Sequence, residues 1–343
     1  MKKRFLYAAA AMLLTACTAK AVEPNYTVTA QFNEEDDDLT AYIIDYDNSE
    51  KIDSAVIADG VAVFKGNIAS PRLARLIVDG GRRGSFILEP GQLKVAKGKV
   101  SGGELNARMD EVEKYMTALS KEFKAVPDSL KESMYPAFSK RAQDITDKAI
   151  ANNLNNPIGY YFFLQNAYDI TLEDLDKAIA KTPALGEYKR IAKLRESKIR
   201  KAETSEGKMF KDFTVTYGDS TWKLSDYVGK GKYTLVDFWA SWCGPCIRET
   251  AVIKDIYKEY NPKGLEIVGV AVWDEPEKTL AAIEKHQLPW KHVINAQTIP
   301  TDIYGIPAIP CIILFGPDGT IIARDKTGDA LREAVKQAME QKN

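Results

Sequence analysis

Trp242-Cys243-Gly244-Pro245-Cys246 is the stretch of sequence that decides the fold of the C-terminal part of this chain. It follows the apolar run Tyr233–Trp239, which is typical of a buried strand, and it precedes Ile247–Tyr260, whose pattern predicts a helix. The first sulfur of a Cys-x-x-Cys motif at such a strand-to-helix turn lies at a helix N-terminus, where unpaired N–H groups stabilise a thiolate. Because a thiolate is the species that attacks disulfides, the motif predicts thiol–disulfide exchange.

The composition of the 343-residue chain is that of a globular protein with room for two or three domains. Its formal net charge of −1 supplies no field that would attract nucleic acid or an anionic membrane. The two histidines, His286 and His292, are too few for a histidine-based metal site, and a zinc site would need two ligands beyond the Cys-x-x-Cys motif. We therefore expect no metal, and no cofactor other than a redox-active disulfide between Cys243 and Cys246.

The first residues of the chain predict a targeting segment, residues 1–16. The positive stretch Lys2-Lys3-Arg4 precedes the apolar stretch Phe5–Ala16, which is too short for a membrane-spanning helix and suits a signal peptide. Leu14-Thr15-Ala16-Cys17 resembles a bacterial lipobox, which implies cleavage before Cys17 and lipidation of that cysteine. By resemblance to lipoprotein sorting signals, Thr18 after this cysteine, in place of Asp, favours the outer membrane. The alternative is an ordinary signal peptide that happens to contain a cysteine.

The apolar pattern changes along the rest of the chain and predicts three regions. Residues 24–102 hold short segments rich in β-branched and aromatic residues between glycine turns, which predicts a small all-β antiparallel domain. Residues 103–203 have helical spacing and predict an α-helical region. The polar stretch 201–207 predicts a linker. Residues 207–343 predict an α/β domain with the element order β, β, α, β, α, β, β, α.

Two motifs give this last domain a specific resemblance. Leu235–Cys246 resembles the active-site segment of the thioredoxin superfamily, and Tyr304–Cys311 resembles the family's loop in which a cis-proline leads into a strand. The insertion Trp273–Trp290, and Glu249 three residues after the second cysteine, resemble the membrane-anchored TlpA/ResA-like branch, which is of the AhpC/TSA type. The preceding regions resemble the domain of unknown function, with its helical extension, found before such domains in Gram-negative lipoproteins. For residues 207–343 the resemblance implies the thioredoxin fold, a central mixed sheet flanked by helices.

The motif and the resemblance together suggest the catalytic residues. Cys243 is expected to be the exposed nucleophile, with a pKa lowered from about 8.5 towards 7, and Cys246 the buried resolving cysteine. Asp237 matches the family's buried carboxylate, whose pKa is raised by burial and which suits proton transfer near neutrality. Glu249 can share that function. A structural Asp237 and a solvated, lysine-paired Glu249 are the alternatives.

Substrate contacts are expected from the residues around the sulfurs and from the second motif. Gly244 and Pro245 form the dipeptide of reducing thioredoxins, by resemblance, and Trp242 would shield the sulfurs. A cis Pro310, which the resemblance implies, would leave the backbone of Ile309 free to pair with an extended substrate peptide.

Cys311 departs from the family's pattern. One interpretation is a small buried hydrophobic residue. The other is a thiol near the active disulfide that modulates it, by a transient disulfide with Cys243 or by tuning that sulfur.

These observations predict a periplasmic, lipid-anchored thiol–disulfide oxidoreductase that reduces protein disulfides. Its expected partners are protein disulfides and a membrane thiol donor of electrons, with no nucleic acid and with the membrane contacted only through the lipid anchor. The alternative is a partner-binding or redox-sensing lipoprotein that uses the domain as a structural module. A peroxiredoxin would need a Thr-x-x-Cys motif, and Ala240-Ser241-Trp242-Cys243 lacks the threonine.

Overall fold

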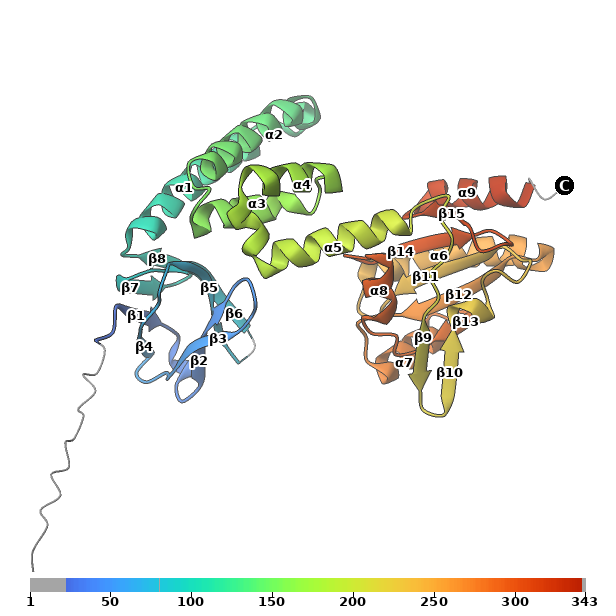
Figure 1. The fold of residues 1–343 in the computed structure, drawn as a ribbon, viewed down its shortest axis with the longest axis horizontal. Coiled ribbons are helices and arrows are strands. Elements are labelled where there is room, and N and C mark those ends of the chain that lie inside the picture. Colours follow the sequence, from blue (N-terminus) through green and yellow to red (C-terminus); the bar gives the residue numbers. More distant parts are fainter. Residues whose placement is uncertain (1–22, 80, 341–343) are drawn as a thin grey trace, which may run out of the picture. The chain divides into compact units, whose positions relative to one another are not determined.

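The computed structural model describes residues 23–340 except Gly80 (Figure 1). The chain divides into two compact units, residues 1–163 and residues 164–343. The predicted signal segment and lipobox, including Cys17, lie outside the described residues. Among the residues that are described, no helix is both long and apolar enough to cross a membrane.

The first unit begins with an all-β domain, as expected. Its strands form two sheets, with the orders β4-β1-β7-β8 and β3-β2-β5-β6. The strands are β1 (Tyr26–Gln31), β2 (Thr40–Asp45), β3 (Lys51–Val56), β4 (Val61–Gly66), β5 (Arg72–Val78), β6 (Gly81–Leu88), β7 (Gly91–Ala96) and β8 (Lys99–Ser101). All of their pairings are antiparallel except that of β1 with β7, which is parallel. Alternate residues such as Val28, Ile43 and Leu76 fill the core between the sheets.

Four of these strands were not expected from the sequence, β3, β6, β7 and β8, and the first two show why. The first reads Lys-Ile-Asp-Ser-Ala-Val and the second begins Gly-Arg-Arg-Gly, so neither has the regular apolar alternation of a half-buried strand. Both segments become strands because each pairs with a neighbouring strand that has a clearer apolar pattern, β3 with β2 and β6 with β5.

The helices that follow do not form one region. α1 (Glu104–Lys124) and α2 (Asp128–Ala151) pack together in the first unit, where Arg141 donates two hydrogen bonds to Glu122, at 2.7 and 2.8 Å. α3 (Pro157–Ala167) spans the division between the units. α4 (Leu172–Lys181) and α5 (Lys189–Glu203) belong to the second unit, because α5 packs against a helix of the C-terminal domain. By their contacts, α4 and α5 thus belong to the same compact unit as the C-terminal domain.

The C-terminal domain has the thioredoxin fold. Its central mixed sheet has the order β13-β12-β11-β14-β15, in which β11 runs parallel to β12 and antiparallel to β14. The elements are β9 (Thr214–Tyr217), β10 (Ser220–Lys223), β11 (Thr234–Trp239), α6 (Gly244–Tyr260), β12 (Glu266–Ala271), α7 (Pro276–Lys285), β13 (Lys291–Val293), α8 (Ile299–Tyr304), β14 (Cys311–Phe315), β15 (Ile321–Arg324) and α9 (Gly328–Glu340). The expected element order lacked β10, β13 and α8, which are short and carry little periodicity.

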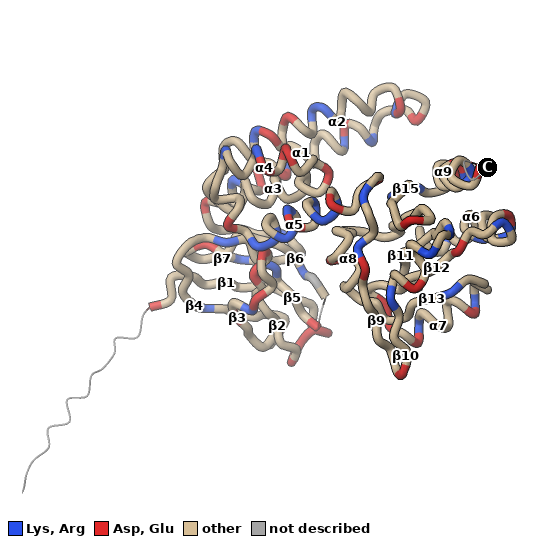
Figure 2. Tube along the Cα trace, turned by 45° about the vertical axis from the view of Figure 1, so that its right-hand side comes forward, with Lys and Arg blue, Asp and Glu red and all other residues tan. Residues whose placement is uncertain are grey.

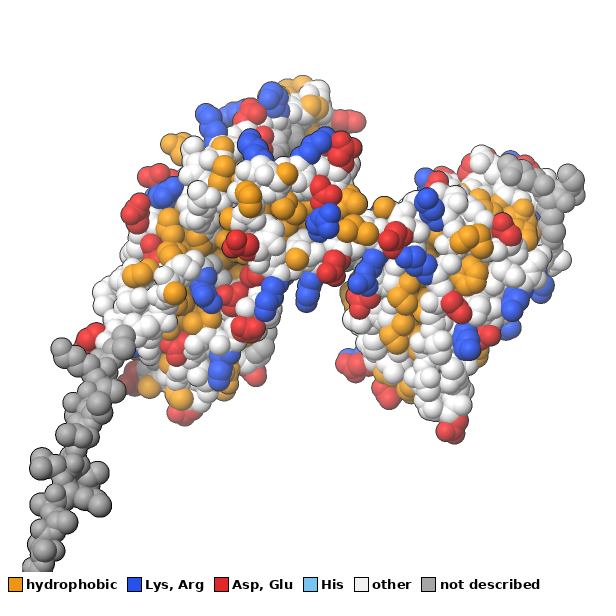
Figure 3. All heavy atoms as spheres, viewed as in Figure 1, with side chains coloured by type: hydrophobic (Ala, Val, Ile, Leu, Met, Phe, Trp, Pro, Cys, Tyr) orange, Lys and Arg blue, Asp and Glu red, His pale blue; other side chains and the backbone are white. Residues whose placement is uncertain are grey.

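The sheet is covered on both faces, which explains why β11 is buried along its whole length. One face packs against α6 and α9 and includes Leu235 and Trp239. The other face packs against α8 and β9 and includes Val236 and Phe238. Figure 3 shows hydrophobic side chains interspersed with charged ones on the visible surface of both units.

Candidate active site

The site begins at the junction of β11 and α6, where Cys243 is the N-cap of the helix. Its sulfur accepts a hydrogen bond from the backbone N–H of Cys246 at 3.1 Å. The first turn of α6 contains no acidic residue, and Pro245 lies in it, where the missing N–H costs no hydrogen bond. Cys243 and Cys246 form a disulfide in this structure. The helix N-terminus thus faces the sulfur at which a thiolate would form on reduction.

The expectation that Cys243 is exposed is wrong for this oxidised form, in which the residue is only 3% exposed. Its backbone N–H donates to the Ala240 carbonyl at 3.1 Å, which tucks the residue into the turn. Its sulfur is bonded to Cys246 and lies 3.8 Å from the carbonyl oxygen of Ile309. In the oxidised form little of Cys243 is therefore accessible to a substrate.

The loop opposite the disulfide contains a cis peptide bond between Ile309 and Pro310. The loop follows α8 and leads directly into β14, so it enters the sheet beside β11. The loop places the Ile309 carbonyl next to the Cys243 sulfur. This is the position expected for a backbone that pairs with a substrate peptide.

Asp237 is a buried carboxyl group on β11, 2% exposed, and lies on the sheet face that packs against α6. Burial is the main cause that raises its pKa to about 8, and the negative charge of Glu249 contributes to this shift. Its Oδ1 atom has no hydrogen-bond partner among the described residues. A carboxyl group of this kind is neutral at pH 7 and exchanges its proton near that pH.

Glu249 lies on α6 and is partly buried. Its Oε1 accepts a hydrogen bond from the backbone N–H of Gly328 at 2.8 Å, at the start of α9. This bond, and not the lysine pair of the alternative interpretation, holds the carboxylate, whose charge acts on Asp237. Glu249 therefore joins two helices and acts electrostatically on the buried acid.

Trp242 is 60% exposed. Its indole therefore does not shield the sulfurs, contrary to the expectation from the sequence. Its Nε1 donates to the carbonyl of Trp273 at 2.9 Å, which holds the ring against the segment after β12. Gly244 and Pro245 are exposed beside it. Together these residues form an accessible rim around the buried disulfide.

Asp274 is a site residue that the sequence did not reveal. It is 5% exposed and accepts hydrogen bonds from the amide and the hydroxyl of Ser241, at 2.7 and 2.9 Å. The hydroxyl of Thr279 donates to it at 2.8 Å, and its own carbonyl accepts from Gln297 at 2.7 Å. Asp274 thereby anchors the turn that carries Cys243. In the sequence it appears only as a polar residue in a loop.

Cys311 does not lie with the disulfide. It pairs with Phe238 across the sheet and packs in the core of the α8 face, whereas Cys243 and Cys246 pack in the core of the α6 face. Its sulfur donates to Asp325 Oδ1 at 3.1 Å. Burial raises its pKa well above the ordinary value, and Asp325 adds to that shift. This environment favours the interpretation of a buried, protonated thiol.

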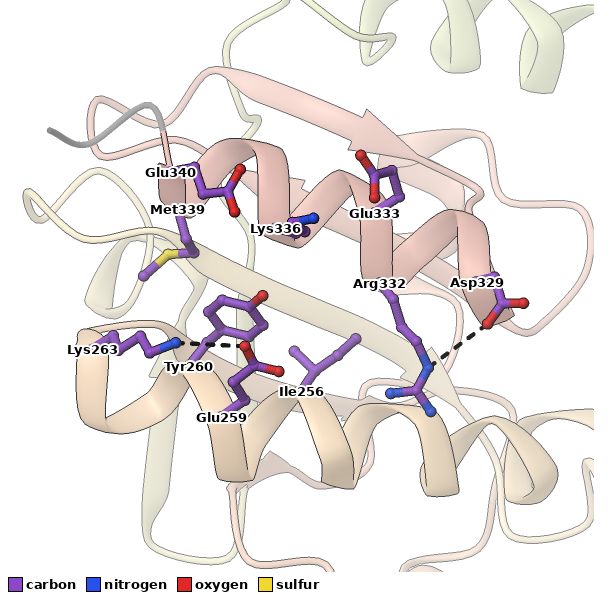
Figure 4. A pocket seen from close by; sticks show the side chains of 10 residues that line it. All are labelled: Ile256, Glu259, Tyr260, Lys263, Asp329, Arg332, Glu333, Lys336, Met339 and Glu340. Carbon is purple, nitrogen blue, oxygen red and sulfur yellow. Dashed lines mark hydrogen bonds and ion pairs between the residues drawn. The ribbon is translucent and has the colours of Figure 1, made fainter.

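A groove in the second unit lies away from this chemistry, between α6 and α9 (Figure 4). It has a volume of about 760 Å³, and charged residues line it in ion pairs such as Lys263 with Glu259 and Arg332 with Asp329. Within the described part of the chain, no group of His, Cys, Asp and Glu residues is arranged to hold a metal ion. The groups that the site brings together are the two sulfurs and the nearby carboxyl groups.

A thioredoxin fold with a Cys-x-x-Cys disulfide at the start of α6 and a cis-proline loop beside it defines the class of this domain. Residues 207–324 match the AhpC/TSA family, and residues 26–109 match a family described only as a domain of unknown function, DUF4369. The C-terminal domain is a TlpA/ResA-like member of the thioredoxin superfamily.

Several known proteins are similar to part of this chain. The chain is 31% identical to the thiol-disulfide oxidoreductase ResA of Geobacillus thermodenitrificans, over 34% of this chain and 66% of that protein. It is 34% identical to ResA of Oceanobacillus iheyensis, over 32% and 57%. The match thus spans somewhat less than two thirds of these curated relatives. Among solved structures, the thioredoxin domain of a thiol-disulfide oxidoreductase from Bacteroides vulgatus is 32% identical, with 39% of this chain and 96% of that chain covered and a TM-score of 0.36.

Proposed function

We propose that the C-terminal domain is a thiol–disulfide oxidoreductase that reduces disulfides in proteins through Cys243 and Cys246. The observation that carries the proposal is the position of the Cys243 sulfur. It contacts the N-terminus of α6, of which Cys243 is the N-cap residue, and it lies 3.8 Å from the carbonyl oxygen of Ile309. The first contact stabilises a thiolate on that sulfur. The second places a peptide-binding backbone next to it.

The reaction consists of two exchanges. In the reduced protein the Cys243 thiolate attacks one sulfur of a substrate disulfide, which forms a mixed disulfide and releases the other substrate sulfur as a thiolate. The Cys246 thiol transfers its proton to Asp237 in those molecules in which this carboxyl group is ionised, and the resulting thiolate attacks the Cys243 sulfur. This step forms the Cys243–Cys246 disulfide and releases the second substrate thiolate, so that two electrons pass to the substrate. A dithiol donor then reduces the disulfide by the reverse exchanges.

The two carboxyl groups have distinct roles in this scheme. Asp237, with a pKa of about 8, accepts the proton of the resolving cysteine inside the buried site. Glu249 sets how readily it does so, because its charge raises the pKa of Asp237. The hydrogen bond from Gly328 keeps that charge in place.

The test is reduction of insulin disulfides by the full chain with dithiothreitol as the electron source. We expect turnover by the wild type and by Cys311→Ser, and no turnover by Cys243→Ser. No turnover by the wild type would instead favour a partner-binding or redox-sensing module. The direction of electron flow is tested by the reduction potential of the pair, which for a reductant is expected near about −270 mV rather than near the roughly −120 mV of strong oxidants.

We further propose that the protein works outside the cytoplasm, anchored to the cell envelope through a lipid on Cys17. The proposal rests on the lipobox-like stretch that ends at this cysteine and on the match to ResA, a family member of the same domain class. Incorporation of a labelled fatty acid into the wild type, and its absence in Cys17→Ala, is the expected result. Equal labelling of both would contradict the anchor at this position.

A further inference from the structure

The loop that carries Ile309 and Pro310 is held at both ends by α5, a helix outside the segment 207–324 that matches the family. Resting on the function proposed above, we propose that the C-terminal end of α5 positions this loop for the substrate peptide. The residues involved are Ser197 and Lys201 of α5 and Thr204, the residue after it. They are positioning residues, because they act on the substrate site through the loop.

The first anchor holds the start of the loop. The buried guanidinium of Arg324 donates from Nη2 to the carbonyl of Tyr304 at 2.7 Å and from Nη1 to the carbonyl of Thr204 at 2.8 Å. Thr204 is fully buried and Arg324 is 7% exposed. Because a buried guanidinium must keep its hydrogen-bond partners, this bridge fixes the last residue of α8 to the end of α5.

The second contact is a direct approach of backbones at Gly305, the residue after α8. A Cβ atom at this position would lie 2.1 Å from the Ser197 carbonyl oxygen and 2.6 Å from the Lys201 nitrogen. The residue also has a φ of +58°, a conformation that glycine adopts without strain. The loop therefore leaves α8 packed against the backbone of α5, with no side chain between them.

The third contact holds the end of the loop. The Cys311 sulfur, directly after Pro310, donates to Asp325 Oδ1, and Lys201 lies 2.7 Å from Asp325 Oδ2. Burial alone would raise the pKa of Asp325, but hydrogen bonds from Lys201 and Cys311 hold it below its ordinary value. Asp325 is thus an anion that links α5 to the first residue of β14. Figure 2 shows that basic residues follow much of α5.

These contacts enclose the loop between two fixed points, and the loop places the Ile309 carbonyl 3.8 Å from the Cys243 sulfur. Loss of the α5 contacts would leave the disulfide and α6 intact, because neither touches α5 in any contact described above. The loop would instead sample more positions, and a peptide that pairs with it would bind less tightly. The expected effect is therefore on substrate binding rather than on the redox pair.

The test compares Lys201→Gln with Arg195→Gln in the full chain. Both changes remove a cation of α5 from an ion pair, Lys201 from Asp325 at 2.7 Å and Arg195 from Asp176 at 2.6 Å. The two side chains are 49% and 45% exposed, so neither loss should prevent folding. The readouts are amide hydrogen exchange in residues 304–311 of the oxidised protein, KM and kcat for a peptide disulfide, and the reduction potential.

We expect Lys201→Gln to speed exchange in residues 304–311 and to raise KM several-fold, with kcat and the reduction potential unchanged. Lys201→Arg should restore both wild-type values, and Arg195→Gln should match the wild type throughout. Unchanged exchange in Lys201→Gln, or faster exchange with unchanged KM, would overturn the inference. If the wild type itself shows no turnover, the proposed function fails, and hydrogen exchange alone then decides whether α5 holds the loop.

Discussion

Ser241 donates two hydrogen bonds to the buried carboxylate of Asp274, from its amide at 2.7 Å and from its hydroxyl at 2.9 Å. The two residues are 33 positions apart in sequence, and the bonds join the turn before Cys243 to the segment after β12. The same segment accepts the indole N–H of Trp242 through the carbonyl of Trp273. The start of α6 is therefore held from outside the helix as well as by its own backbone.

This relationship predicts that Asp274→Asn destabilises the domain. The introduced amide N–H₂ would face a donor from Ser241 or Thr279 and leave a buried group without a partner, at a cost of about 1–3 kcal/mol. Urea unfolding should show this loss, together with reduced insulin turnover. Glu275→Gln is the matched control, because Glu275 pairs with Lys278 on the surface, and it should stay close to the wild type. Equal stability of the two variants would contradict an anchoring role for Asp274.

Replacement of Trp242 should separate binding from stability. Because the indole is 60% exposed, Trp242→Ala should change the free energy of unfolding by less than about 1 kcal/mol. The same change removes apolar surface from the rim of the site and should raise KM for a peptide disulfide. Trp242→Phe keeps an aromatic ring but loses the hydrogen bond to Trp273, so an intermediate KM is expected. Wild-type KM in Trp242→Ala would show that the rim does not contact substrate.

The buried acid predicts a pH dependence of stability. Below about pH 4 Asp237 is protonated in both the folded and the unfolded chain and contributes no difference. Between about pH 4 and 8 the unfolded chain releases a proton that the folded protein keeps, because the folded pKa is about 8, so stability falls as pH rises. The slope from this group is at most about 1.4 kcal/mol per pH unit.

Asp237→Asn should therefore be more stable than the wild type at pH 8, and this advantage should shrink as the pH falls towards 4. Urea unfolding at several pH values measures it. Asp255→Asn, which removes a surface carboxylate paired with Arg332, should keep the wild-type dependence. Parallel curves for the wild type and Asp237→Asn would show that Asp237 is already ionised in the folded protein.

Glu249→Gln tests the electrostatic link between the two carboxyl groups. A glutamine can still accept the hydrogen bond from Gly328, but it removes the charge that raises the pKa of Asp237. Reaction of the reduced protein should gain rate as Asp237 becomes ionised, so the variant should reach its plateau at lower pH than the wild type. The measurement is the pH profile of the exchange rate with a peptide disulfide. An unshifted profile would separate Glu249 from the proton transfer.

The sequence was sufficient for the features that depend on neighbouring residues. A mainly apolar stretch predicted β11, and the cysteine pair after it predicted a helix N-terminus at the first sulfur, where α6 begins. The cis peptide before Pro310 followed from resemblance and is present. These features are local, so a short stretch of sequence contains the information that specifies them.

The features that the sequence did not predict depend on distant contacts. Cys311 follows the cis-proline directly, but its register opposite Phe238 turns it to the other face of the sheet from Asp237. Asp274 lies in a loop, and its anchoring role is evident only from the hydrogen bonds that Ser241 donates to it. Arg324 resembles an ordinary residue at a strand end, although its guanidinium binds the end of α5. Each of these partners is fixed by the assembled fold, which the sequence pattern alone does not provide.

The most direct test of the central claim is to trap the mixed disulfide with a peptide that contains one disulfide bond. Reduced Cys246→Ser should retain the peptide, with a mass increase that proteolytic mapping places on Cys243. Reduced Cys243→Ser should remain unmodified under the same conditions, because Cys243 and not Cys246 is the N-cap of α6, where the helix N-terminus stabilises a thiolate. An adduct on Cys246 in Cys243→Ser, without one on Cys243 in Cys246→Ser, would contradict the assignment of Cys243 as the attacking sulfur.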